Sequence, residues 1–225
     1  MLTLFGVMRE KSEFKIIIFD MDGTLLDGRG IFVIAKKFGF LDELWRLIKD
    51  DSMEFYERSI EIAKLSKGYK IDEYLGIFRS VKLQPNIEKI VEQLKKKNIV
   101  CAIATDSYNI LADDLKKRLG FDYAFANNLI SNENVITGEL EINNKSLIPD
   151  FVSGNIYSIC KSQILEDLCT KHGFSVNQAI AVGDGRVDTG MIKKSGLGFA
   201  FNAPEEVNDC ADVVIDDLTK ILKYI

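Results

Sequence analysis

The chain has 225 residues, of which 47% are hydrophobic and 28% charged, and its formal net charge is −5. This length and composition are those of one large globular domain, or of a core domain with a smaller insertion. The acidic balance gives no reason to expect nucleic acid or an acidic membrane surface as a partner.

The first predicted element is a buried strand over residues 14–19, preceded by a loosely held lead-in. This segment is apolar except for Lys15, which is typical of a strand covered on both faces. It ends in Asp20, and Asp22 follows, so both carboxylates leave an extended chain on one side. Gly23 then allows a sharp turn. Such a pair can hold a hard cation or supply a nucleophile and an acid, although alone it could be only an aspartate-rich turn.

The segment between residues 26 and 83 carries no strong strand pattern. Apolar residues recur at helical spacing over residues 41–63, and a further helix is expected over residues 71–81. We therefore predict a small helical insertion after the first strand.

From residue 85 the alternation of helices and strands that is typical of an α/β sheet resumes. Helices are predicted over residues 86–98, 110–119 and 158–171, before residue 194 and over 218–224, and strands over 99–104, 122–126, 178–182, 199–201 and 212–215. Two polar segments, 131–138 and 139–146, are expected to form a hairpin or flap.

Three predicted strands end in side chains that can bind ligands. These are Asp20, Asp22, Thr105, Asp184 and Asp188. In a right-handed parallel sheet they meet at one carboxyl edge. Lys161, near the start of an amphipathic helix, adds a cation. Such a set suits phosphoryl transfer, because one carboxylate can attack phosphorus, another acid can protonate the leaving oxygen, and magnesium and lysine can neutralise the phosphate.

These motifs resemble those of the haloacid dehalogenase-like phosphohydrolases, and most of all their phosphoserine phosphatase branch. The matching segments are DMDGT at 20–24, IAT at 103–105, Lys161 and GDGRVD at 183–188, together with DYAFAN at 122–127 and KYI at 223–225. They span nearly all of residues 14–225. Four motifs in the same order are more specific than the first motif alone.

The resemblance implies an α/β fold with a Rossmann-like parallel-sheet core, residues 1–26 and 84–225, and a helical cap over residues 27–83. It implies a magnesium-dependent phosphomonoester hydrolase that acts on a small phosphorylated metabolite through an aspartyl-phosphate.

The resemblance also implies catalytic roles. Asp20 would be the nucleophile, and Asp22 would protonate the leaving alcohol and then activate water. Thr105 and the backbone amide of Asp106 would bind phosphate, and Lys161 would hold both phosphate and nucleophile.

A magnesium site is implied as well. Asp20, the backbone carbonyl of Asp22 and Asp184 would bind the ion, with Asp188 as a direct ligand or an outer partner.

The sequence departs from the branch where those enzymes read serine. Arg29 stands in place of a glutamate that reads the ammonium, and Ile62 in place of an arginine that reads the carboxylate, with Arg58 one helical turn away. Asp106 replaces a small glycine in the second motif, and Val187 replaces an asparagine in the last. We therefore expect retained phosphatase chemistry without a serine-reading pocket, and Arg29 as a specificity residue.

Three other functions stay open at this point: a phosphoserine phosphatase proper, a mutase-type phosphotransferase, and a catalytically weak binding or regulatory protein. Val187 and Asp106 keep the last of these open, whereas the retained acids and lysine argue against it.

Four cysteines without CxxC spacing, one of them inside the 99–104 strand, indicate reduced thiols. The single histidine, His172, precedes a glycine near a helix end, where we expect a surface or capping role. The apolar stretch of residues 1–11 is too short for a signal peptide or membrane span. We expect a cytoplasmic monomer or homodimer with no nucleic-acid or membrane partner.

Overall fold

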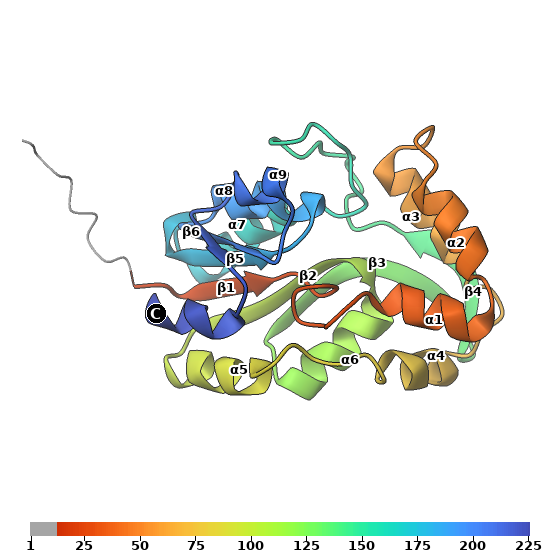
Figure 1. Cartoon of the computed structure of the whole chain (residues 1–225), viewed down its shortest axis with the longest axis horizontal. Coiled ribbons are helices and arrows are strands. Elements are labelled where there is room, and N and C mark those ends of the chain that lie inside the picture. Colours follow the sequence, from red (N-terminus) through yellow and green to blue (C-terminus); the bar gives the residue numbers. More distant parts are fainter. Residues whose placement is uncertain (1–12) are drawn as a thin grey trace, which may run out of the picture.

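The computed structural model describes residues 13–225 (Figure 1). The expectations of a loosely held lead-in and of no leader fall on residues 1–12, outside the described part. Among the described residues, no helix has both the length and the apolar composition that a membrane crossing requires.

A seven-stranded sheet in the order β4-β3-β2-β1-β5-β6-β7 forms the centre of the molecule. Its strands are β1 (Ile16–Phe19), β2 (Val100–Tyr108), β3 (Tyr123–Asn132), β4 (Val135–Glu141), β5 (Ala179–Gly183), β6 (Leu197–Phe201) and β7 (Val213–Ile215). Neighbouring strands are parallel except for the antiparallel pair β3 and β4. The predicted α/β fold with a parallel sheet is confirmed.

Strand β1 lies in the middle of the sheet, and all four of its side chains are fully buried. Ile17 and Phe19 pack in one hydrophobic cluster with α5 (Ile87–Lys96) and α6 (Asn109–Leu119). The alternate residues Ile16 and Ile18 pack in a second cluster with α7 (Lys161–His172) and α8 (Thr189–Lys194). Figure 1 shows these helix pairs on opposite faces of the sheet, which explains why β1 is apolar at successive positions.

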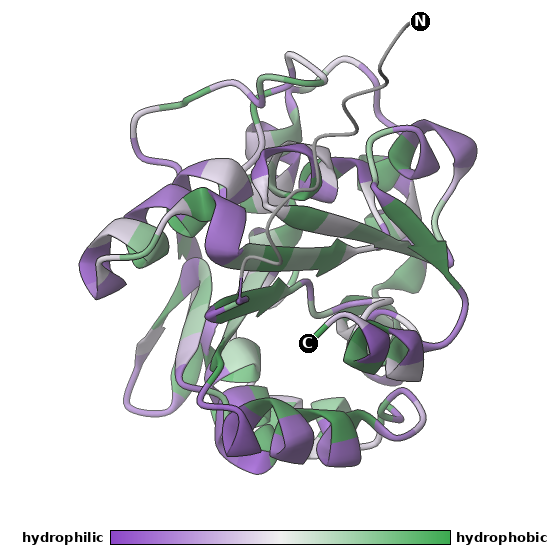
Figure 2. Ribbon diagram, turned by 90° about the vertical axis from the view of Figure 1, so that its left-hand side faces the viewer, coloured by the Kyte–Doolittle hydropathy of each residue, from purple (hydrophilic) through white to green (hydrophobic). Residues whose placement is uncertain are grey.

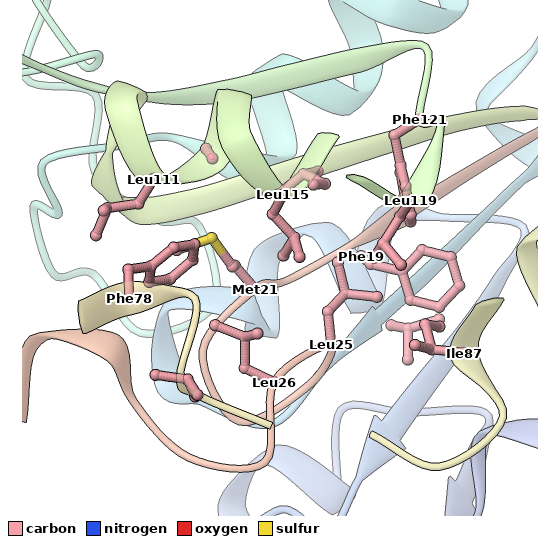
Figure 3. Close-up of a cluster of buried hydrophobic side chains, with 14 of the residues drawn as sticks. Phe19, Met21, Leu25, Leu26, Phe78, Ile87, Leu111, Leu115, Leu119 and Phe121 are labelled. Atoms are coloured by element: carbon pink, nitrogen blue, oxygen red, sulfur yellow. The ribbon is translucent and has the colours of Figure 1, made fainter. Parts of the chain in front are cut away.

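The chain after β1 is anchored by apolar side chains that alternate with the acids. Met21, Leu25 and Leu26 are fully buried and belong to the cluster that contains Phe19 (Figure 3). The rings of Phe19 and Phe121 meet edge to face at 5.8 Å. Figure 2 shows the hydrophobic colour concentrated in the central strands. The core therefore fixes the backbone from which the first two aspartates project.

Four helices occupy the predicted helical insertion: α1 (Gly30–Phe38), α2 (Leu41–Ile48), α3 (Phe55–Lys64) and α4 (Ile71–Phe78). They gather at one end of the sheet, beside β4 (Figure 1).

The β3–β4 hairpin joins this helical layer to the sheet. Its two-residue turn is Glu133–Asn134, with both residues at positive φ, as hairpins of this kind require. The amide of Gly68 donates to the carbonyl of Ile136 at 2.8 Å, and the amide of Ile71 donates to the carbonyl of Asn134 at 2.9 Å. A segment distant in sequence thus supports the helices that follow β1.

Several boundaries differ from the prediction. β2 continues to Tyr108, four residues beyond the apolar run, because its pairing with β3 resumes there after an irregularity. The hairpin strands lie earlier than the two polar segments suggested. The C-terminal segment Leu218–Lys223 is a 3-10 helix, and α9 (Glu205–Asn208) is a short helix before β7.

Candidate active site

The register of the central strands brings the predicted residues to one edge of the sheet. Phe19 pairs with Ile103 in β2 and with Val182 in β5. The residues that follow these paired positions, Asp20, Thr105 and Asp184 among them, therefore lie at the same edge of the sheet. The amide of Asp20 donates to the carbonyl of Val182 at 2.9 Å, which continues the pairing up to the site.

Lys161, the first residue of α7, is the cation of this site. Its Nζ lies 2.5 Å from Asp20 Oδ1 and 2.6 Å from Asp188 Oδ1, and only 2% of the residue is exposed. Burial alone would lower the pKa of Lys161, but Asp188, Asp20 and Asp106 outweigh it and raise the pKa above its usual value. The lysine is held charged, because a neutral lysine would leave two buried carboxylates without their counter-charge.

Asp188 is held by both of its carboxylate oxygens. Oδ1 accepts the bond from Lys161, and Oδ2 accepts from the amides of Asp184 at 3.1 Å and Gly185 at 2.9 Å. A Cβ on Gly183 would lie 2.4 Å from the Asp188 carboxyl carbon, so only glycine fits there.

Two residues of the first motif, Gly23 and Thr24, lie against Asp184 and fix its position. Its Oδ1 accepts a hydrogen bond from Thr24 Oγ1 at 3.1 Å. Gly23 adopts a φ of +93°, and a Cβ there would lie 2.4 Å from Asp184 Oδ2. The glycine of the first motif therefore serves both the turn and the close approach of the acid.

Asp20, Asp184 and Asp188 form a cluster in which one carboxylate oxygen from each lies within 4.8 Å of the others. An all-oxygen donor set with this much negative charge suits a hard divalent cation. The donor chemistry therefore fits the divalent metal that the resemblance implies.

Asp22 lines the same cavity but is not among the three acids of this cluster. Its Oδ1 accepts a hydrogen bond from the amide of Gly30 at 2.6 Å, at the first turn of α1, where backbone amides lack helical partners. Burial raises the pKa of Asp22 to about 7, with smaller contributions from Asp20 and Asp106. This carboxyl can therefore exchange a proton near neutral pH, unlike an ordinary aspartate.

Within β2, directly after its apolar run, Thr105 is fully buried and its Oγ1 accepts a bond from the amide of Ser107 at 3.2 Å. Asp106, predicted as a phosphate contact through its amide, also lines the cavity described next. Desolvation by the surrounding protein raises the pKa of Asp106, and the nearby carboxylate of Asp20 adds to this effect. The positive charge of Lys161 acts in the opposite direction.

A cavity of about 520 Å³ lies over the aspartates and beneath the helices that follow β1. Its apolar wall comes mainly from those helices: Ile31, Phe32, Leu44, Ile48, Phe55 and Ile62. Arg29 and Arg58 also line it. Burial alone would lower the pKa of Arg29. The nearby carboxylates, which are Asp106, Asp184, Asp20 and Asp22, outweigh burial and raise the pKa above its usual value, so the guanidinium stays charged.

Six of the eight predicted site residues line this cavity: Asp20, Asp22, Arg29, Asp106, Asp184 and Asp188. Lys161 contacts two of them, and Thr105 precedes Asp106 in β2. Sequence reasoning had not singled out three further lining residues, Tyr157, Arg186 and Glu206. Arg186 lies within the last motif and pairs with Glu206, so its place in that motif was the available signal. Tyr157 comes from the loop before α7, and its ring contacts the ring of Phe55 at a tilt, with centroids 4.9 Å apart, which no motif indicated. His172 contacts Tyr123, away from this site.

Known proteins share this sequence pattern. The family model of haloacid dehalogenase-like hydrolases matches residues 14–196. The phosphoserine phosphatase of Methanocaldococcus jannaschii is 31% identical over 216 residues, which cover 94% of this chain and 97% of that protein. That of Archaeoglobus fulgidus is 35% identical over 207 residues, which cover 91% of this chain but only 56% of that longer protein.

Solved structures agree with the sequence comparisons. A substrate-bound phosphoserine phosphatase complex superposes with a TM-score of 0.80 at 30% identity, covering 95% of this chain and 99% of that chain. A phospho-aspartyl intermediate analogue of phosphoserine phosphatase gives a TM-score of 0.79 at 30% identity, with the same coverage. The chain therefore belongs to the haloacid dehalogenase-like hydrolases, in their phosphoserine phosphatase-like branch.

Proposed function

We propose that this phosphatase is a magnesium-dependent phosphomonoester hydrolase that forms an aspartyl-phosphate on Asp20. The observation that carries the proposal is the buried Lys161, which contacts the carboxylates of Asp20 and Asp188 at the floor of a cavity. The phospho-aspartyl analogue of the related phosphoserine phosphatase represents the same kind of intermediate in that protein.

In the proposed reaction, an oxygen of Asp20 attacks the phosphorus and the bond to the leaving alcohol breaks. Asp22 gives its proton to the leaving oxygen, which its raised pKa supports, and the hydrogen bond that it accepts from the amide of Gly30 fixes its position. Asp22 then takes a proton from water, which attacks the phosphorus and releases Asp20. Lys161, Thr105 and the amide at position 106 orient and neutralise the phosphate.

We infer that magnesium is held by Asp20, the backbone carbonyl of Asp22 and Asp184, with Asp188 outside these ligands. Both oxygens of Asp188 already accept hydrogen bonds, from Lys161 and from two amides. When bound, the ion supplies positive charge to the phosphate.

Removing divalent metal is expected to abolish hydrolysis of p-nitrophenyl phosphate. Excess chelator should stop turnover and added magnesium should restore it. Calcium should inhibit, because it takes more ligands at longer distances than magnesium accepts. Circular dichroism in chelator controls for loss of fold, and full activity in excess chelator would contradict the proposal.

We further infer a core over residues 1–26 and 84–225 and a cap over residues 27–83. We expect a cytoplasmic monomer or homodimer acting on a small metabolite rather than on nucleic acid or membranes. The free cysteines, with Cys101 and Cys169 buried, support a reducing compartment, and the net charge of −5 supports the choice of partner.

Phosphoserine itself is the second candidate substrate, because the relatives from Archaeoglobus fulgidus and Methanocaldococcus jannaschii are both phosphoserine phosphatases by name. Arg29 opposes it. A guanidinium beside the acids repels an ammonium, whereas it suits an anionic or polyhydroxylated substituent. We therefore propose that the substrate lacks an amine.

The substitution Arg29→Glu tests this preference. In the wild type, we expect kcat/KM for phosphoserine to fall below that for phosphoglycerate or a hexose phosphate. Arg29→Glu should shift the ratio towards phosphoserine at least severalfold, and Arg29→Gln should lie between the two. The ratio is the readout, because the new carboxylate near Asp22 and Asp106 will slow all substrates. A tenfold or greater preference for phosphoserine in the wild type would contradict the role of Arg29.

A further inference from the structure

Asn127 of β3 is a fully buried asparagine whose side chain is bonded at both polar atoms. Its Nδ2 donates to the backbone carbonyl of Asp106 at 2.6 Å and to Ser158 Oγ at 2.9 Å. Its Oδ1 accepts a bond from the backbone amide of Asn143 at 2.9 Å. A backbone amide can only donate, so the atom that faces Asn143 must be the oxygen. The carboxamide is therefore held in one orientation, with its nitrogen towards Asp106.

The part of β2 that Asn127 meets is the part where strand pairing is irregular. Ala104 pairs with Phe125, and pairing resumes only at Tyr108, which lies opposite Asn127 itself. The intervening residues of β2, 105–107, thus lie opposite a single residue of β3. A bulge of this kind interrupts the regular ladder of hydrogen bonds and re-aims side chains near a site. The bond from the Asn127 side chain therefore supports the segment where the strand ladder is interrupted.

The peptide group between Asp106 and Ser107 is held at both ends. Its carbonyl oxygen accepts from Asn127, and its N–H donates to Thr105 Oγ1 at 3.2 Å. A hydroxyl oxygen that accepts such a bond keeps its own proton for another partner. None of residues 13–225 accepts that proton, although Thr105 is fully buried. This chain of bonds leaves the Thr105 hydroxyl as a donor, which is the role that phosphate binding requires of it.

Asn127 also holds the segment that leads into Lys161. Ser158, which accepts the second bond from Asn127, lines the cavity and lies shortly before Lys161, the first residue of α7. Only 1% of Ser158 is exposed. One carboxamide thus joins the bulge of β2 to the start of the helix that carries the buried lysine. Its loss would let these two parts of the site move relative to each other.

We propose that Asn127 is a positioning residue of the reaction, which orients the peptide after Asp106 so that Thr105 donates to the phosphate. It also keeps this donor in register with Lys161. The inference rests on the proposed hydrolysis of phosphomonoesters. Asn127 is not one of the residues that line the cavity, so it acts through the groups it holds and not on the substrate. Donors that are fixed before the substrate binds need no reorganisation during the reaction.

A double-mutant cycle between Asn127→Leu and Thr105→Val tests the proposal, with p-nitrophenyl phosphate at saturating magnesium. Leucine has nearly the size of asparagine and removes every bond of the carboxamide, and valine removes only the hydroxyl of Thr105. We expect Asn127→Leu to lower kcat/KM about thirtyfold and to raise the inhibition constant of inorganic phosphate about tenfold. In the Thr105→Val background the same change should cost about threefold or less, because the donor that it positions is already absent.

Asn144→Leu is the matched control, because Asn144 is also a buried asparagine bonded at both polar atoms. Its partners are the backbone groups of Ile148 and Tyr157. Its effect on kcat/KM, whatever its size, should be the same with and without the Thr105 hydroxyl. If Asn127→Leu does not fold, Asn127→Ala takes its place in the cycle, since it leaves room for water to satisfy the freed groups.

Two results would overturn the role of Asn127. One is an equal loss of kcat/KM in both Thr105 backgrounds, which would make Asn127 part of the fold and not of the reaction. The other is an inhibition constant for inorganic phosphate that stays at the wild-type value in the Asn127 variant that folds. Absence of any p-nitrophenyl phosphate hydrolysis by the wild type with magnesium would instead overturn the proposed function on which the inference rests.

Discussion

Replacing Asp20 with asparagine is expected to abolish turnover while leaving the fold intact. The amide has almost the shape of the carboxylate, and its oxygen can still accept the bond that Lys161 Nζ makes at 2.5 Å. It is a far poorer nucleophile, however, and it brings no charge to the metal. Because Asp20 lies close to Asp184 and Asp188, removing its charge also relieves repulsion, so thermal stability should not fall.

The measurement is the initial rate with p-nitrophenyl phosphate at saturating magnesium, together with a thermal melt of each protein. Asp27→Asn makes the same chemical change at an exposed position in the following loop and should keep wild-type activity. More than a few per cent of wild-type turnover in the Asp20 variant would rule out the covalent mechanism.

The placement of the acids was predictable because it depends on local patterns that the core enforces. β1 is apolar at every position because both faces are covered, and Met21 is buried between two acids that project the other way. Parallel pairing of Phe19 with Ile103 and Val182 then brings the later motifs to the same edge. Each of these steps follows from burial and from the geometry of parallel strands.

The contacts between the helical insertion and the rest of the chain were not predictable in the same way. The bonds from Gly68 and Ile71 to the β3–β4 hairpin join segments more than 60 residues apart, and the sequence carries no periodic signal for them. The position of the Arg58 guanidinium in the cavity wall likewise depends on the neighbouring Asp50 carbonyl and Phe55 ring. The motifs thus identify the chemistry, whereas tertiary packing decides what the cavity recognises.

The second large effect is expected for Lys161→Met, which keeps much of the side-chain stem and removes the cation. We expect a loss of a hundredfold or more in kcat/KM, or roughly 3 kcal/mol of transition-state stabilisation. Lys161 is fully buried at its side chain and contacts both Asp20 and Asp188. Without it, a phosphate dianion would enter a site whose nearest groups are carboxylates, and the charge that develops on phosphorus oxygens would lose its fixed donor.

The variant will also lose stability, because two buried carboxylates are left without their partner. Kinetics are therefore measured well below the melting temperature of the variant, at saturating magnesium. Lys171→Met, an exposed lysine on the same helix, is the matched control and should retain wild-type kcat/KM. Lys161→Arg separates charge from shape, because it keeps a cation but brings a larger group into contacts of 2.5 and 2.6 Å, so partial activity is expected. An unchanged rate in Lys161→Met would show that another group holds the phosphate, and the assignment of the buried lysine to the reaction would then be wrong.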